Sequence, residues 1–108
     1  GRRGRLAGVR LADGRRLALG ALAVATRLTP RLAGLERLGL RPVPLGDGLG
    51  ARLTVDGAGR TDVPGVWAAG NVADPMAAVA GALDQGVRAG AAINMDLIDA
   101  DARVGAAR

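Results

Sequence analysis

The stretch TDVPGVWAAGNVAD, residues Thr61–Asp74, decides how the rest of the chain is interpreted. A turn at Pro64-Gly65 precedes the apolar run Val66–Ala69, which predicts a short buried strand. The strand ends at Gly70-Asn71, where a glycine lets a ligand approach the backbone because no Cβ stands in the way. A short polar side chain just beyond can hydrogen-bond a sugar or polyol hydroxyl. The pattern predicts one part of a nucleotide-cofactor site.

A long helix with a slim surface is predicted directly after this stretch. Asp74 is a good N-cap, and Pro75 suits the first helical position, where its missing N–H costs nothing. One face is apolar at helical spacing and is interpreted as core: Met76, Val79, Leu83 and Val87. The helix is expected to run to about Ala100, with a bend at Gly86 or Gly90, and the residues after it to fray.

The N-terminal part of the chain predicts a hairpin followed by a buried strand. Two apolar-rich runs, Arg5–Leu11 and Arg16–Thr26, flank Asp13-Gly14, a pair that tolerates the positive φ of tight turns. Within the second run, Ala21–Ala25 is apolar at every position, as expected for a strand covered on both faces. Pro30 then ends it.

The middle of the chain is expected to hold little regular structure. Leucines at three-residue spacing predict a short helix over Arg31–Leu38, closed by Gly39. Residues 41–60 are rich in Gly and Pro and are interpreted as a loop, with a short strand near Arg52–Val55.

Composition restricts the chemistry that the chain can perform. In 108 residues there is no Cys and no His, which excludes disulfides, thiolate metal sites and the commonest general base. Trp67 is the one aromatic residue, so any core must be built from Ala, Leu and Val. Residues 1–60 hold 12 Arg against four acidic residues and residues 61–108 hold three against six, which gives charges of +8 and −3 and the net +5.

Thr61–Asp74 resembles the second flavin signature of the FAD-dependent pyridine nucleotide-disulfide oxidoreductases, thioredoxin-reductase-like branch. In that family the strand ends at a Gly-Asp pair whose carboxylate binds the ribityl chain of FAD, and the next helix points its N-terminus at the flavin ring. The resemblance implies that the cofactor-binding residues are Gly70, Asn71, Val72 and Ala78, with no catalytic or metal-binding residue in the chain.

Two upstream segments resemble the same family. ALAVATRLTP, residues 21–30, is similar to the crossover from the NAD(P) domain back to the FAD domain, and LADGRRL, residues 11–17, to the hairpin that closes the NAD(P) domain. The chain departs from the pattern at three positions. Asn71 stands where the family has Asp, and Arg27 occupies the usual glycine of the crossover. Ala78 stands where the family often has Gln against the flavin, so that contact is lost unless Gln85 or a backbone group replaces it.

The expected fold is α/β, a C-terminal fragment of an FAD/NAD(P)-binding Rossmann-like fold with a long C-terminal helix. Residues 1–28 would end the NAD(P)-binding domain, and residues 29–108 would form the C-terminal part of the FAD-binding domain. The resemblance implies a flavoprotein oxidoreductase that passes electrons from NAD(P)H through FAD to a disulfide or another acceptor. This chain would supply the second FAD motif and would be inactive alone.

The resemblance also implies the partners and the compartment. The partners are the missing N-terminal part of the same fold, a second copy in a homodimer, and a small-molecule or protein disulfide acceptor. Neither nucleic acid nor a membrane is expected as a partner, and the location is expected to be cytoplasmic.

Other interpretations stay open at this point. The chain could be a truncated, non-catalytic remnant that binds nothing, or an Arg-rich nucleic-acid-binding module whose affinity would fall steeply with salt. Gly70-Asn71 could be a plain strand-end turn. Trp67 is interpreted as a core or interface anchor, and Asp84 and Gln85 as exposed helix residues.

Overall fold

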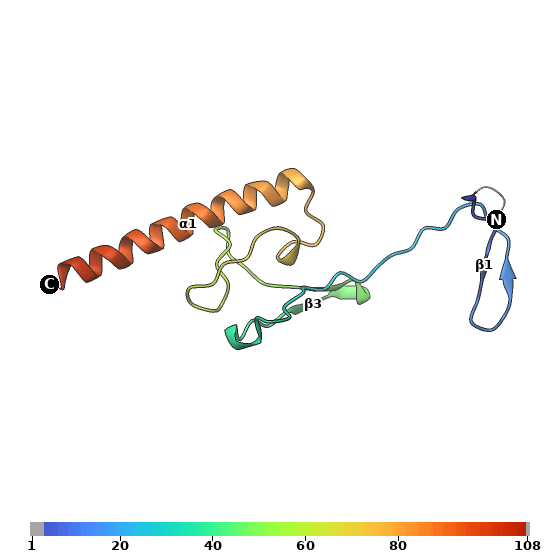
Figure 1. Ribbon diagram of the computed structural model, residues 1–108, viewed down its shortest axis with the longest axis horizontal. Helices are drawn as coiled ribbons and strands as arrows, with labels where there is room; N and C mark the ends of the chain where they lie inside the picture. Colours follow the sequence, from blue (N-terminus) through green and yellow to red (C-terminus); the bar gives the residue numbers. More distant parts are fainter. Residues whose placement is uncertain (1–3, 108) are drawn as a thin grey trace.

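The computed structural model describes residues 4–107, so residues 1–3 of the expected NAD(P)-domain segment and residue 108 lie outside the described residues. Figure 1 shows two small hairpins, a winding segment and one long C-terminal helix, arranged along the chain. The elements are β1 (Val9–Arg10), β2 (Arg16–Leu17), η2 (Glu36–Leu38), β3 (Val43–Leu45), η3 (Gly46–Gly48), β4 (Gly50–Arg52), η4 (Gly70–Val72) and α1 (Val79–Ala106). Small sheets with one long helix form a partial α/β fold.

The hairpin predicted around Asp13-Gly14 is confirmed, with shorter strands than expected. β1 and β2 pair antiparallel, Val9 opposite Leu17. Gly14 adopts a φ of 89°, which a residue with a Cβ rarely accepts. The Asp13 carboxylate accepts the backbone N–H of Arg15 at 3.0 Å and its Nε at 2.7 Å, and these two contacts, backbone first, hold the pKa of Asp13 below its ordinary value. The turn is therefore stabilised by hydrogen bonds between its own residues.

The buried strand predicted at Ala21–Ala25 is wrong. These residues are not in a strand, and Leu22 and Val24 are 55% and 69% exposed. In Figure 1 this segment runs extended between the first hairpin and the rest of the chain. A strand covered on both faces needs neighbouring strands along its edges, and the described part of the chain brings none to this run.

The helix predicted over Arg31–Leu38 is reduced to the 3-10 turn η2. Gly34 has a φ of 87°, which interrupts a right-handed helix inside the predicted span. The Glu36 carboxylate accepts the Gly34 N–H at 2.9 Å, and this bond holds the pKa of Glu36 below its ordinary value. Gly39 ends the turn in the left-handed region at φ 72°, as predicted.

A second hairpin lies inside the region that the sequence predicted as a loop. β3 and β4 pair antiparallel, with Pro44 opposite Ala51. The predicted strand near Arg52–Val55 is therefore displaced, since β4 ends at Arg52. Pro44 is tolerated because β3 is an edge strand and needs no donor on its outer side. The many Gly and Pro residues here shape a tight hairpin rather than preventing one.

Leu28 joins the second hairpin from the other side of β4. Its N–H donates to the Leu49 carbonyl at 3.0 Å, and its own carbonyl accepts the Ala51 N–H at 2.8 Å. Gly50 lies opposite Leu28 in a parallel bridge and has a φ of 127°. A Cβ on Gly50 would overlap the Leu28 carbonyl oxygen. The glycine thus permits the contact that brings the segment after residue 27 against β4.

The strand predicted at Val66–Ala69 is present as one antiparallel bridge, Arg60 opposite Trp67. The Ala68 N–H donates to the Gly59 carbonyl at 2.8 Å. The Thr61 hydroxyl donates to the Val66 carbonyl at 2.9 Å and closes the turn between the two segments. These bonds lead the chain into η4.

The helix start predicted at Asp74 and Pro75 is wrong, because α1 begins at Val79 with Ala78 as its N-cap. The Asp74 side chain does accept a backbone N–H, that of Met76 at 3.2 Å, but in a turn rather than in a helix. The extended ψ of Ala78, 165°, separates this turn from α1. The side chain of Asn71 holds the turn, as described below.

The end of α1 also differs from the prediction. The helix runs 28 residues to Ala106, past the expected end at Ala100, and no bend occurs at Gly86 or Gly90. In Figure 1 α1 is a single straight rod. The Arg103 Nε donates to the Asp99 carbonyl at 3.0 Å, and a cation in the last turn favours the helix dipole.

The described chain buries few side chains. The buried apolar residues are Leu53, Ala73 and Ala89. The apolar stripe that the sequence predicted as core is exposed instead, with exposed fractions of 84%, 88%, 69% and 66% for Met76, Val79, Leu83 and Val87. The prediction failed because α1 contacts the chain through its small residues, which leaves the larger ones facing outward.

The dimensions agree with this sparse core. The radius of gyration is 21.3 Å and the principal extents are 74 × 27 × 23 Å. A compact domain of this length has a radius of gyration of about 13 Å. The chain is therefore an extended set of elements with large apolar surfaces left uncovered.

Candidate functional site

Gly70 begins the short turn η4, which we call the glycine–asparagine turn (Gly70–Val72). Its φ is 76°, and its carbonyl accepts the N–H groups of Ala73 at 3.0 Å and Asp74 at 2.9 Å. A Cβ on Gly70 would meet only the Ala82 Cβ, at an ordinary 3.7 Å. Glycine is favoured here by backbone conformation, and a Cβ would touch Ala82 without a clash.

Asn71 is exposed and uses its side-chain amide to hold the following turn. Its Nδ2 donates to the Pro75 carbonyl at 3.1 Å and to the Ala77 carbonyl at 3.5 Å. Its Oδ1 accepts no hydrogen bond from residues 4–107. One oxygen thus stays available for a ligand hydroxyl, which is the role that the sequence predicts.

Gln85 was predicted to be an exposed helix residue, and this prediction is wrong. It is half-buried, and its Oε1 accepts the Gly70 N–H at 2.8 Å. The bond joins α1 to the glycine–asparagine turn across 15 positions of sequence. The sequence does contain a weak indication of this contact. Gln85 is a single long polar side chain among Ala and Gly residues on that face of the helix, so it alone can form a hydrogen bond with the preceding turn. Asp84 beside it is exposed, as predicted.

The two other predicted residues are Val72, the last residue of the glycine–asparagine turn, and Ala78, the N-cap of α1. The Val72 carbonyl accepts the N–H of buried Leu53 at 2.8 Å, which fixes the turn against the segment that follows β4. Ala78 is exposed, and its carbonyl accepts the Ala82 N–H at 2.9 Å in the first turn of α1. Gly70, Asn71 and Val72 therefore form one turn, whereas Ala78 stands at the start of the helix.

A groove of about 310 Å³ joins the glycine–asparagine turn to the segment that resembles the crossover. We call it the Asn71 groove; it is lined by Leu28, Thr29, Pro30, Arg31, Asn71, Val72 and Pro75. The sequence singled out both segments, but it did not bring Thr29 and Arg31 into the site. They reach it because Leu28 is bound to β4. The residues that line the groove include three polar ones, Thr29, Arg31 and Asn71, among four apolar ones.

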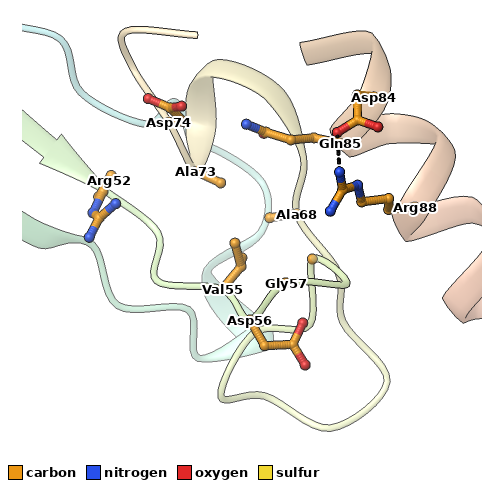
Figure 2. A pocket seen from close by; sticks show the side chains of 11 residues that line it. Arg52, Val55, Asp56, Gly57, Ala68, Ala73, Asp74, Asp84, Gln85 and Arg88 are labelled. Carbon is orange, nitrogen blue, oxygen red and sulfur yellow. Dashed lines mark ion pairs between the residues drawn. The ribbon is translucent and has the colours of Figure 1, made fainter. Parts of the chain in front are cut away.

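A second hollow of about 300 Å³, the helix pocket, lies between α1 and the loop after β4. Figure 2 shows Arg52 and Asp56 on the loop side, with Asp84, Gln85 and Arg88 on the α1 side. The Arg88 Nη2 lies 2.9 Å from the Asp84 Oδ2, an exposed pair that contributes little stability. The Asp56 carboxylate accepts the N–H of Arg60 at 2.9 Å and that of Ala58 at 2.8 Å, which holds the pKa of Asp56 below its ordinary value. No motif in the sequence predicts this pocket.

Trp67 is half-buried beside Arg60, whose guanidinium carbon lies 5.6 Å from the centre of the indole ring. This distance is typical of a cation–π contact. The Trp67 Nε1 is buried and has no hydrogen-bond partner among the described residues. Buried indole N–H groups usually have an acceptor, so Trp67 fits an interface anchor better than the centre of a core.

The groups that surround these hollows can bind and orient a ligand. Among residues 4–107, no group of three or more His, Cys, Asp or Glu side chains is placed to hold a metal ion. The polar residue types that line the Asn71 groove instead suit a polyol and an anion, since an amide oxygen accepts from hydroxyls and a guanidinium pairs with phosphate. No helix in this part of the chain has both the length and the apolar character needed to cross a membrane.

The chain is similar to two solved structures, one of which is an oxidoreductase. No family model matches the chain, and no curated protein matches it. Among solved structures, HlmI is similar over 96% of this chain, with 38% identity and a TM-score of 0.72. An oxidoreductase from Agrobacterium tumefaciens is similar over 84% of this chain, with 33% identity and a TM-score of 0.66.

The matched region is a minor part of each of these structures. The chain spans 31% of the HlmI chain and 30% of the Agrobacterium chain. The extended shape and the exposed stripe of α1 agree with a segment of that kind. The chain is thus similar in sequence and fold to one segment of an oxidoreductase.

Proposed function

We propose that the chain supplies part of the FAD site of a thioredoxin-reductase-like pyridine nucleotide oxidoreductase. Electrons would pass from NAD(P)H through FAD to a disulfide or another acceptor. The observation that carries the proposal is the Asn71 groove, where the crossover-like segment and the glycine–asparagine turn line one hollow. The similarity to an oxidoreductase over 84% of the chain supports the class of reaction.

The donor set at the groove fits a flavin dinucleotide. FAD carries a ribityl chain of hydroxyls and an anionic pyrophosphate. Asn71 would accept from a ribityl hydroxyl through its free Oδ1, Thr29 would donate a hydrogen bond to a sugar or phosphate oxygen, and Arg31 would balance negative charge. The missing Cβ of Gly70 would let the ligand approach the backbone more closely than any other residue allows. Bound FAD would accept the hydride, and the residues of this chain would bind and orient the cofactor.

The proposal includes a partner that covers α1. The apolar side chains of Val79, Leu83 and Val87 on α1, and of Met76 in the turn before it, are exposed. Contiguous apolar surface of this kind marks an interaction site. The partner proposed is the N-terminal part of the same fold, which would also bring the pyrophosphate loops and the NAD(P)H site. The assembled protein would be a cytoplasmic homodimer.

A chimera tests the proposal directly. This chain replaces the matched segment of HlmI, and the flavin absorbance of the purified protein is compared with that of HlmI itself. We expect bound FAD in the chimera and loss of FAD in its Gly70→Val variant, because a β-branched residue resists a φ of 76° and adds bulk beside the backbone. Gly46→Val is the matched control, since Gly46 has open space and no positive φ.

The results that oppose the proposal are equally concrete. A folded chimera without flavin, made from a parent that holds flavin, would contradict it. An HlmI parent that itself purifies without flavin would also remove the basis for assigning FAD to this chain.

A further inference from the structure

The segment from the glycine–asparagine turn to the start of α1 is fixed by two carboxamide side chains, and we call it the tethered loop (Gly70–Ala78). Asn71 binds the loop from within, through Nδ2 bonds to the carbonyls of Pro75 and Ala77. Gln85 binds it from α1, through its Oε1 and the Gly70 N–H. These are the only Asn or Gln side chains near the loop, because the third, Asn94, lies further along the exposed part of α1.

The two tethers differ in whether an acid could replace the amide, because Asn71 donates and Gln85 accepts. Asn71 acts as a donor to carbonyl oxygens, and an ionised carboxylate has no proton to donate. A carboxylate at this position would face two carbonyl dipoles with the same sign of charge. Gln85 acts as an acceptor, so a carboxylate could replace it there.

The Asn71 tether also explains where α1 begins. The carbonyls of Pro75 and Ala77 would have to point along a helix axis if the helix began at Asp74. Because the Asn71 amide holds both of them, the loop stays non-helical until Ala78. Both bonds come from the Nδ2 of Asn71, and its Oδ1 accepts from none of residues 4–107.

We propose that Asn71 and Gln85 are positioning residues that set the shape of the tethered loop, and that position 71 requires a neutral amide. The use of this shape for FAD rests on the proposed function, whereas the shape itself does not. It follows that Asn71→Asp, the residue usual in the family that the sequence resembles, would loosen the loop in this chain rather than improve the site. A preformed loop lowers the ordering cost of binding.

Amide hydrogen exchange in the 108-residue chain, followed by NMR, tests the tethers without any flavin. Gln85→Met removes the acceptor at similar length, and Gln85→Glu keeps an acceptor. We expect the Gly70 N–H to exchange about two- to tenfold faster in Gln85→Met, the factor that one lost neutral hydrogen bond gives. Gln85→Glu should stay near the unsubstituted chain. Equal exchange of Gly70 in Gln85→Met and the unsubstituted chain would overturn the role of Gln85.

The neutral-amide requirement has its own matched pair of variants. Asn71→Asp should speed exchange of the Ala73 and Asp74 amides, which close the glycine–asparagine turn, by a similar factor. Asn94→Asp adds the same charge on α1 away from the loop and should leave these amides unchanged. If both variants behave alike, or if Asn71→Asp slows exchange, the requirement is wrong.

The chimera separates this inference from the proposed function. Loss of FAD on Asn71→Asp in the HlmI chimera, together with faster loop exchange, supports both. A chimera that binds no FAD, while the exchange data show the tethers, contradicts the proposed function and leaves the tethers standing. Unchanged FAD content with a loosened loop contradicts the positioning role at the groove.

Discussion

Gly50 is the residue at which the described fold tolerates a side chain least. Its φ is 127°, and a Cβ would overlap the Leu28 carbonyl oxygen. We expect Gly50→Ala to destabilise the pairing of Leu28 with β4 by about 2–4 kcal/mol, because the clash falls on backbone that cannot rotate away. Exchange of the Ala51 N–H, which donates to Leu28, measures this loss. Gly46→Ala has open space and should change the same amide by less than about 0.5 kcal/mol; equal effects of the two substitutions would contradict the argument.

Asp56 makes the stability of the turn at residues 56–60 depend on pH. The N–H groups of Arg60 and Ala58 lower the pKa of its carboxyl from the ordinary 3.8. A depressed folded pKa contributes stability above the unfolded value, and that contribution is lost as pH falls through the folded pKa. We therefore expect the Arg60 and Ala58 amide signals to titrate together with a midpoint below 3.8. Asp56→Asn should remove the transition, and a midpoint above 3.8 would show that these bonds do not form.

Among the elements, α1 depends on the small residues of its inner face. Ala89 is buried, and a Cβ on Gly59 would lie 3.1 Å from the Ala89 Cβ. We expect Ala89→Leu to cost about 1–3 kcal/mol in a urea titration, because the larger side chain must push α1 from the loop. Ala91→Leu places the same volume on an exposed part of the helix and should change stability by less than about 0.5 kcal/mol. Equal costs would mean that this face is not packed.

The elements that the sequence predicted well are those closed by local chemistry. Asp13-Gly14 makes a turn whose bonds lie within three residues, and Gly39 ends η2 in the left-handed region that its type favours. The buried strand at Ala21–Ala25 failed because apolar composition cannot show whether neighbouring strands exist. The helix start failed because the tether from Asn71 overrides the capping preference of Asp74.

In the candidate site, too, the sequence predicted the local turn but not the contacts between distant segments. The turn at Gly70-Asn71 followed from a motif that is continuous in sequence. Its contacts with Gln85, and its shared groove with Thr29 and Arg31, depend on segments that only the folded chain brings together. The assignment of FAD contacts to Gly70, Asn71, Val72 and Ala78 stays a prediction.

At the scale of the whole molecule, the exposed apolar stripe of α1 should control association. The isolated chain is expected to self-associate as its concentration rises, since Leu83 and Val87 are 69% and 66% exposed. The double variant Leu83→Glu, Val87→Glu should lower the apparent mass in sedimentation at equal concentration. Ala106→Glu adds charge at the exposed helix end as a control for solubility alone. An unchanged mass distribution in the double variant would show that the stripe is not the associating surface.

The separation of the hairpins from α1 also bears on the order in which the chain acquires structure. Each hairpin pairs segments that are close in sequence, and the hydrogen bonds of α1 lie within the helix itself. Hairpins and helices of this kind form within about microseconds in an unfolded chain. The bonds from Leu28 to β4 and from Gly70 to Gln85 close longer loops and should follow. Docking against a covering surface comes last and depends on the concentration of that surface when it is a separate chain. Where the covering surface belongs to a separate chain, we therefore expect the final structure to appear at the rate of encounter with that chain rather than at the rate of this chain's own folding.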